Sequence, residues 1–182
     1  MNIPVNFKFN IIKGDKKRMI ILRKTPGESL DHILLKLVAY LLFFDDNLLI
    51  ETKAPQHYKP DLVKFDKEQT WKPVKWIDCG TIDSKKLFKI SKHNRQAEIY
   101  IFKSSRDSAQ ALKKKVSKKI KSFSNINYFI FNKENIEAMK FLLENRNKIK
   151  ILENKIDYSA NSAFLCLNFN NQTLQLNFEY VM

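Results

Sequence analysis

The sequence predicts one α/β domain, in which a mixed central sheet is flanked by helices and extended by antiparallel strands at both ends of the chain. Three observations support this prediction. Short apolar runs typical of buried strands alternate with helical patterns in the middle of the chain. Both ends instead alternate apolar and polar side chains, as antiparallel strands with one solvated face do. A chain of 182 residues that is 44% hydrophobic is enough for one domain with its own core.

The N-terminal part predicts a hairpin followed by a long helix. Residues 5–12 alternate in polarity, and a tight turn leads to a second strand at 19–22. From Leu30 to Leu42, apolar residues recur at helical spacing, which indicates a long and largely buried helix. Thr25 and Glu28 have the spacing of a capping box, so the sequence predicts that the helix begins there.

Three polar residues recur every four positions along this helix pattern, namely Glu28, His32 and Lys36. They form a polar stripe on an otherwise apolar helix. Two interpretations are open at this point. Glu28 caps the helix and the stripe is a solvated face, or the stripe belongs to a functional site.

Two extended segments follow, at 60–65 and 73–80, and each carries one aspartate in a row of apolar side chains. If these segments pair antiparallel, Asp61 at the start of one comes close to Asp78 at the end of the other. The alternative is ordinary turn chemistry, because Asp61 follows a proline and Asp78 opens an Asp-x-Gly turn.

The middle of the chain predicts strands that alternate with basic helices. In order, these are a short basic helix after Gly80, a strand at 97–102, a basic helix at 106–121, a strand at 127–131 and a helix at 134–146. The final segments, 148–158 and 162–180, predict a terminal antiparallel hairpin or meander. The lysines of the 106–121 helix indicate either a solvated face or a surface that follows phosphates.

The net charge of +14 favours a polyanionic partner, with nucleic acid first and an anionic membrane surface second. Part of this charge reflects a Lys-, Asn- and Ile-rich composition of the kind that AT-rich genomes produce. The longest apolar run, Leu37 to Phe44, is far shorter than the roughly 20 residues of a membrane span. Cys79 and Cys166 belong to no CxxC pair, and no secretory signal is visible, so we expect a reducing cytoplasm.

Carboxylates on neighbouring strands, with one more from a packed helix, would give the oxygen-rich site that Mg²⁺ prefers. A nearby lysine would stabilise charge on a phosphate oxygen, and the metal would activate water. Glu28, Asp61 and Asp78 together therefore indicate a metal-dependent nuclease.

Two long motifs carry a resemblance to a known family, namely PGESLDHILLKLVAYLLF and WIDCGTIDSKKLFK, together with the closing β segment. The sequence resembles the YaeQ-like proteins, whose fold is a variation on the PD-(D/E)XK nuclease superfamily. The resemblance implies a restriction-endonuclease-like core over about 25–131. It also implies added β segments at 1–24 and 148–182, within one domain that spans residues 1–182.

The resemblance also implies a set of acidic site residues. The helix acid of the superfamily corresponds to Glu28, its Pro-Asp pair to Pro60 and Asp61, and its second acid to Asp78. These three carboxylates would bind Mg²⁺ or Mn²⁺.

The lysine of the superfamily motif does not follow this correspondence. The motif has lysine two residues after the second acid, where this chain has Gly80. Some superfamily members carry this lysine on the following helix, which here nominates Lys89 or Lys85. The functional expectation is phosphodiester hydrolysis of nucleic acid. The alternative is an inactive nuclease-fold module that binds nucleic acid or a protein partner.

Overall fold

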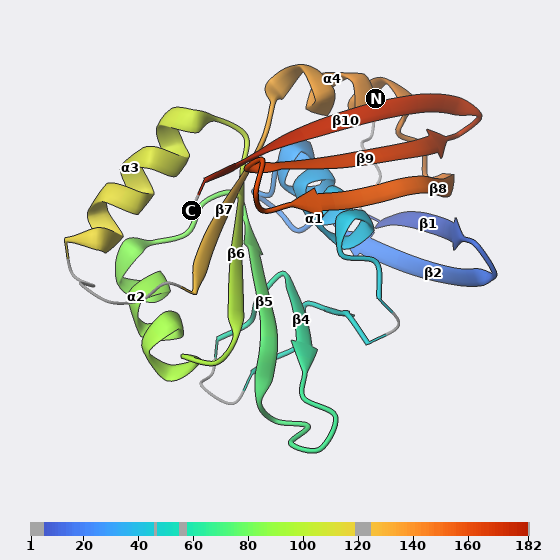
Figure 1. The fold of residues 1–182 in the computed structure, drawn as a ribbon. Coiled ribbons are helices and arrows are strands. Elements are labelled where there is room, and N and C mark those ends of the chain that lie inside the picture. Colours follow the sequence, from blue (N-terminus) through green and yellow to red (C-terminus); the bar gives the residue numbers. More distant parts are fainter. Residues whose placement is uncertain (1–5, 46, 55–57, 119–124, 182) are drawn as a thin grey trace.

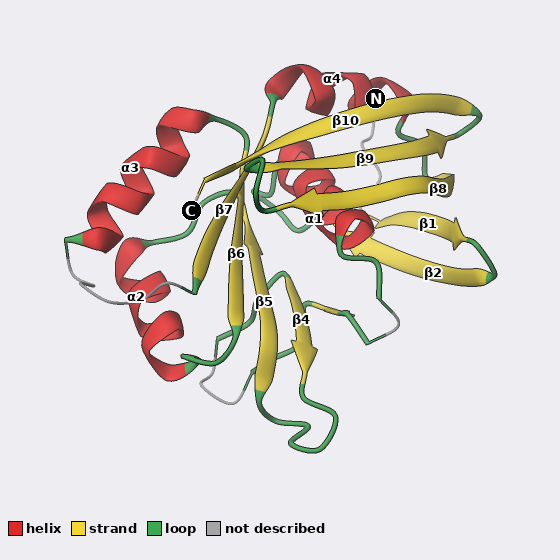
Figure 2. Cartoon of the chain, in the orientation of Figure 1, coloured by secondary structure: helices red, strands yellow, loops and turns green. Residues whose placement is uncertain are grey.

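The structure, a computed structural model, describes residues 6–45, 47–54, 58–118 and 125–181. These residues form one mixed sheet of ten strands and four helices (Figures 1 and 2). The strands are β1 (Asn6–Lys13), β2 (Lys16–Arg23), β3 (Leu49–Ile50), β4 (Leu62–Phe65), β5 (Pro73–Cys79), β6 (Glu98–Lys103), β7 (Ile126–Phe131), β8 (Arg146–Asp157), β9 (Ser162–Phe169) and β10 (Gln172–Val181). The helices are α1 (Leu30–Leu42), α2 (Ser84–His93), α3 (Arg106–Ser117) and α4 (Lys133–Leu142).

The sheet has the strand order β2-β1-β8-β9-β10-β7-β6-β5-β4-β3 and curls around α1 (Figure 1). On the inner face, α1 and α4 pack against strands from both halves of the sheet, and together they make the larger hydrophobic core. On the outer face, α2 and α3 cover β5, β6 and β7 and enclose a second, smaller core. The architecture is therefore the mixed α/β class that the sequence predicts. No helix in the described ranges is long and apolar enough to cross a membrane.

Helix α1 is buried on almost all sides, since every residue from Ile33 to Leu42 is buried. Its apolar periodicity predicted this placement correctly, but its predicted start was wrong. The helix begins at Leu30, and Ser29 is the N-cap, whose side chain accepts a hydrogen bond from the backbone N–H of His32. The preceding Thr25 to Glu28 segment is a turn in which Gly27 has φ +82°. This left-handed conformation at the third position is typical of a type II turn, and it separates Glu28 from the helix.

The central part of the fold confirms the predicted pairing. Strand β4 pairs antiparallel with β5, and the register Leu62 to Ile77 brings Asp61 opposite Asp78. The parallel pairs β5 with β6 and β6 with β7 are connected through α2 and α3, as the alternation of strand and helix predicted.

The two ends of the chain meet in the same sheet. Strands β8, β9 and β10 form the predicted antiparallel meander, and β1 and β2 form the predicted hairpin. The sequence did not predict that β1 pairs with β8 in parallel. Helix α4 ends at Leu142 instead of Arg146, because Arg146 already begins β8. Helix α3 ends at Ser117, and the last residues of the predicted 106–121 helix lie outside the described residues.

Candidate functional site

A buried lysine is at the centre of a charged cluster beside the start of α1. The side chain of Lys36 is 1% exposed, and its Nζ lies 2.7 Å from Oε1 of Glu28 and 2.8 Å from Oε1 of Glu51. The other carboxylate oxygen of Glu51, Oε2, lies 2.8 Å from the Nζ of Lys59 and forms a second ion pair. The polar stripe of α1 is therefore not a solvated face. It places a cation between carboxylates from two other parts of the chain.

The electrostatics of this cluster keep its groups charged. Burial by itself raises the pKa of Glu28 and of Glu51, but hydrogen bonds from Lys36 outweigh it and hold both pKa values below the ordinary range. Burial likewise lowers the pKa of Lys36, and its bonds to both glutamates outweigh this effect and raise it. The ion pairs thus offset the cost of removing three charges from water.

The imidazole of His32 connects Glu28 with Asp61. Its Nδ1 lies 3.2 Å from Oε1 of Glu28, and its Nε2 lies 3.2 Å from Oδ2 of Asp61. The same Asp61 oxygen accepts a hydrogen bond of 2.7 Å from the backbone N–H of Cys79, at the end of β5. Two of the three predicted acidic residues therefore lie on either side of one histidine ring.

Asp78 lies beside this group but faces a different environment. Its side chain is on the face of β5 that packs against α2, and its Oδ2 accepts a hydrogen bond of 2.8 Å from Nε1 of Trp76. Burial raises the pKa of Asp78, and the charge of Asp61 adds to this shift, while Lys86 and the Trp76 bond oppose it. Asp78 and Asp61 thus interact electrostatically at the end of the strand pair, while Asp61 lies beside His32 and Asp78 lies on the face that packs against α2.

A lysine at the end of β5 comes from the neighbouring strand. Lys103, the last residue of β6, is buried, and its Nζ donates a 2.5 Å hydrogen bond to the carbonyl oxygen of Gly80. Burial lowers the pKa of Lys103, and the charge of Asp78 partly opposes this shift. Its ammonium therefore lies beside Gly80, just after the end of β5.

Both lysines nominated from the sequence lie on α2. Lys85 and Lys89 are exposed, and across the described ranges neither forms an ion pair with Glu28, Asp61 or Asp78. The α2 lysine whose charge acts on Asp78 is Lys86.

A pocket of about 340 Å³ opens beside this cluster. Glu28 lines it from the turn before α1 and His32 from the first turn of α1, while Gly80 and Ser104 follow the ends of β5 and β6. Gly80 has φ +68°, and a Cβ at this position would lie 3.8 Å from the His32 ring. The chain thus brings acidic, imidazole and basic groups to one end of the parallel strands, beside an opening.

Sequence reasoning missed Glu51, Lys59 and Lys103. Glu51 lies in a loop after the two-residue strand β3, where no periodic pattern marks it. Lys103 follows the apolar run of β6, and the one available signal was a lysine at the carboxyl end of a strand parallel to β5.

Together, the curled sheet and the charged cluster at the end of β5 define an α/β protein with a polar site beside buried parallel strands. The family model described as "YaeQ protein" matches residues 14–165. This chain belongs to the YaeQ family.

Solved structures agree with this assignment. The YaeQ protein from Xanthomonas axonopodis pv. citri is 18% identical, with a TM-score of 0.74 over 97% of each chain. The YaeQ protein from Pseudomonas syringae is 16% identical, with a TM-score of 0.72 over 97% of this chain and 94% of that chain. At these identities the similarity shows the fold alone. A comparison with curated proteins finds no match.

Proposed function

We propose that this protein is a nuclease-like phosphodiesterase that hydrolyses nucleic acid with the help of Mg²⁺ or Mn²⁺, on a restriction-endonuclease-like core. One observation carries the proposal. Glu28 and Asp61 come from distant parts of the chain, and both lie 3.2 Å from His32, which lines a pocket together with Glu28. Carboxylates that converge on an opening are the donor type that hard divalent cations bind.

The donor set fits a metal that is shared with its substrate. Among the described residues, no three His, Cys, Asp or Glu side chains are grouped closely enough to hold a metal ion by themselves. Mg²⁺ commonly binds to one or two carboxylates, with water and substrate phosphate as its other ligands. Glu28 and Asp61 would supply these carboxylates. We include Asp78 as a third, because it interacts electrostatically with Asp61, although its side chain lies on the face of β5 that packs against α2.

When bound, the metal would polarise the phosphate and lower the pKa of an attacking water. His32 would position these carboxylates, because its two ring nitrogens lie 3.2 Å from oxygens of Glu28 and Asp61 and neither is free to accept a proton from the water. Lys103, whose ammonium lies beside Gly80, would stabilise the charge on the phosphate oxygens, a role that the sequence had given to Lys89 or Lys85.

Cleavage assays test this function. Labelled single- and double-stranded DNA and RNA are incubated with the protein in Mg²⁺, in Mn²⁺ and in EDTA. We expect cleavage that depends on the metal. The cleavage rate should fall at least about 100-fold in Asp61→Asn and in Glu28→Gln. Asp107→Asn, an exposed acidic residue on α3, is the matched control and should retain activity. Cleavage that survives in EDTA, or in purified Asp61→Asn, would show that another site or a contaminant is responsible.

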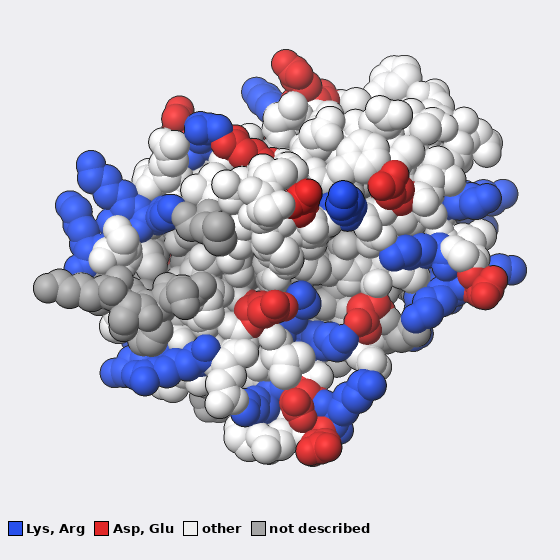
Figure 3. All heavy atoms as spheres, in the orientation of Figure 1, with Lys and Arg blue, Asp and Glu red and all other residues white. Residues whose placement is uncertain are grey.

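A second function is favoured by the charge balance of the cluster. Lys36 and Lys59 already pair with Glu28 and Glu51. Exposed lysines follow α3, where Figure 3 shows basic side chains gathered at the left of the molecule. A module that binds nucleic acid without cleaving it would need only this basic surface. Its binding would weaken steeply with salt and would be unchanged by EDTA and by Glu28→Gln.

A further inference from the structure

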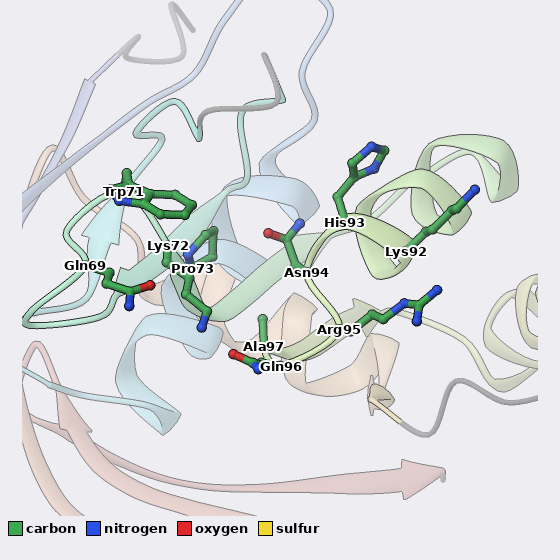
Figure 4. A pocket seen from close by; sticks show the side chains of 10 residues that line it. All are labelled: Gln69, Trp71, Lys72, Pro73, Lys92, His93, Asn94, Arg95, Gln96 and Ala97. Carbon is green, nitrogen blue, oxygen red and sulfur yellow. The ribbon is translucent and has the colours of Figure 1, made fainter.

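A second pocket, of about 340 Å³, lies at the other end of β5 (Figure 4). The turn between β4 and β5 forms one wall, and the end of α2 with the loop that leads to β6 forms the other. Its lining residues are Gln69, Trp71, Lys72, Pro73, Lys92, His93, Asn94, Arg95, Gln96 and Ala97. No acidic residue is among them, although the chain has 19.

The aromatic member of this pocket is unusually accessible. Trp71 is 62% exposed, whereas Trp76, five residues later in the chain, is fully buried. Figure 4 shows the indole of Trp71 extending over the pocket from the β4–β5 turn. A large exposed aromatic ring at the rim of a hollow is a recurrent mark of a binding surface, because it leaves apolar area in water until a ligand covers it.

Cations line the same hollow on both walls, with the side chains of Lys92 and Arg95 extending away from Trp71 in Figure 4. Lys72 comes from the β4–β5 turn, and Lys92 and Arg95 come from the opposite wall (Figure 4). The position of Lys92 in the last turn of α2 also complements the helix dipole, so this lysine alone would indicate little. Lys72 lies in a turn away from any helix end, where its charge acts on Asp66.

We propose that this pocket binds a base of single-stranded nucleic acid, with Trp71 stacked on the base and Lys72 and Lys92 on the flanking phosphates. The combination of an accessible indole and cations without acids is the chemistry that binds single strands with little sequence preference. A single strand fits because the faces of bases in a duplex are covered by their neighbours.

This proposal rests on the proposed function, which gives nucleic acid as the substrate, and it adds that the strand bound is single-stranded. Pro73 in this pocket and Cys79 beside Asp61 are the two ends of β5. A seven-residue strand is roughly 20 Å long, so the pocket would hold the substrate several nucleotides from the proposed cleavage site.

Fluorescence anisotropy of a labelled single-stranded 12-mer of thymidylate, in EDTA, tests the pocket separately from catalysis. We expect Trp71→Ala to weaken binding about 10-fold or more and Trp71→Phe to retain most of the affinity. Lys92→Gln should lower the dependence of log affinity on log salt by about 0.7, the value for one phosphate contact. Phe141→Ala, an 87% exposed aromatic on α4, and Lys17→Gln on β2 are the matched controls.

The same anisotropy measurement on a 12-base-pair duplex is the comparison, because we expect Trp71→Ala to weaken duplex binding much less than single-strand binding. If Trp71→Ala binds the single strand as tightly as wild type, or loses affinity for duplex to the same extent, the stacking proposal is wrong and the pocket is only a basic surface. Because metal is absent, loss of the cleavage activity proposed above would not alter this result. Conversely, if Trp71→Ala cleaves nucleic acid and binds the single strand as well as wild type, the pocket proposal is wrong and the proposed function is unaffected.

Discussion

Lys36 sets the charge balance of the candidate site, because it is the buried cation between Glu28 and Glu51. Both glutamates have pKa values below the ordinary 4.5, so their contribution to stability is present above that pH and is lost as pH falls through the lower values of the folded state. The ion pairs thus stabilise the fold at neutral pH.

Replacing this cation removes the buried ion-pair partner that Glu28 and Glu51 share, and leaves them only His32 and Lys59 as charged neighbours. We expect Lys36→Met to lower the free energy of unfolding by about 3 kcal/mol at pH 7. The difference from wild type should narrow toward pH 4, because burial then raises the glutamate pKa values and the side chains become protonated. Urea unfolding at both pH values measures this effect, with the exposed Lys89→Met as control. An equal loss at both pH values would indicate lost packing instead of lost charge pairing.

Asp78 has the opposite relation to stability. Burial raises its pKa above the ordinary 3.8. The contribution of this group to stability is therefore largest below pH 3.8 and is lost as pH rises through the higher pKa of the folded state. Asp78→Asn keeps an acceptor for the Trp76 ring without the charge. We expect it to stabilise the protein at pH 7 by about 1 kcal/mol, or roughly 3 °C in Tm. Thermal melts would contradict this account if the variant were destabilised at pH 7 or if its gain did not shrink in acid.

At the scale of elements, the turn before α1 positions Glu28. Gly27 has φ +82°, and no heavy atom lies within 4 Å of the place that a Cβ would take, so the effect of a side chain there is backbone strain and not a clash. Gly27→Ala should lower the free energy of unfolding by about 1 kcal/mol, whereas Gly27→Asn should cost less, because Asn tolerates this conformation. Chemical denaturation of the two variants compares them directly. Equal stability of wild type and Gly27→Ala would contradict the assigned turn.

Local patterns predicted most elements and part of the site. The apolar spacing from Leu30 to Leu42 predicted α1, and strand alternation predicted that Asp61 and Asp78 are opposite each other. The start of α1 was missed because Thr25 and Glu28 have the spacing of both a capping box and a turn. Lys103 was missed because its approach to Gly80 depends on how β6 aligns with β5, which no local pattern reports.

At the scale of the whole molecule, Asn147 ties the two ends of the chain together. It is fully buried, and its side chain bonds the backbone oxygen of Lys8, both backbone groups of Glu144 and the side chain of Asn170. These contacts fix the parallel pairing of β1 with β8, whose partners are far apart in sequence. Sequence patterns predicted the hairpin and the meander but not this junction, since nothing local specifies a distant strand partner.

Removing this side chain should weaken the whole sheet. Asn147→Ala leaves several buried backbone groups without partners, so we expect the free energy of unfolding to fall by roughly 3 kcal/mol. Asn10→Ala, an exposed residue on β1, should change it by no more than about 0.5 kcal/mol. Guanidinium unfolding measures both. Similar values for the two variants would show that the strand pairing does not depend on Asn147.

The acidic site is tested most directly by calorimetric titration with Mn²⁺, with and without a non-hydrolysable phosphodiester oligonucleotide. Wild type should bind Mn²⁺, more tightly when the oligonucleotide is present, because its phosphate supplies ligands that the protein lacks. Asp61→Asn and Asp78→Ala should lose this binding while they remain folded by circular dichroism. Mn²⁺ affinity that is the same in wild type and both variants, or no binding by wild type even with the oligonucleotide, would contradict the proposed metal site.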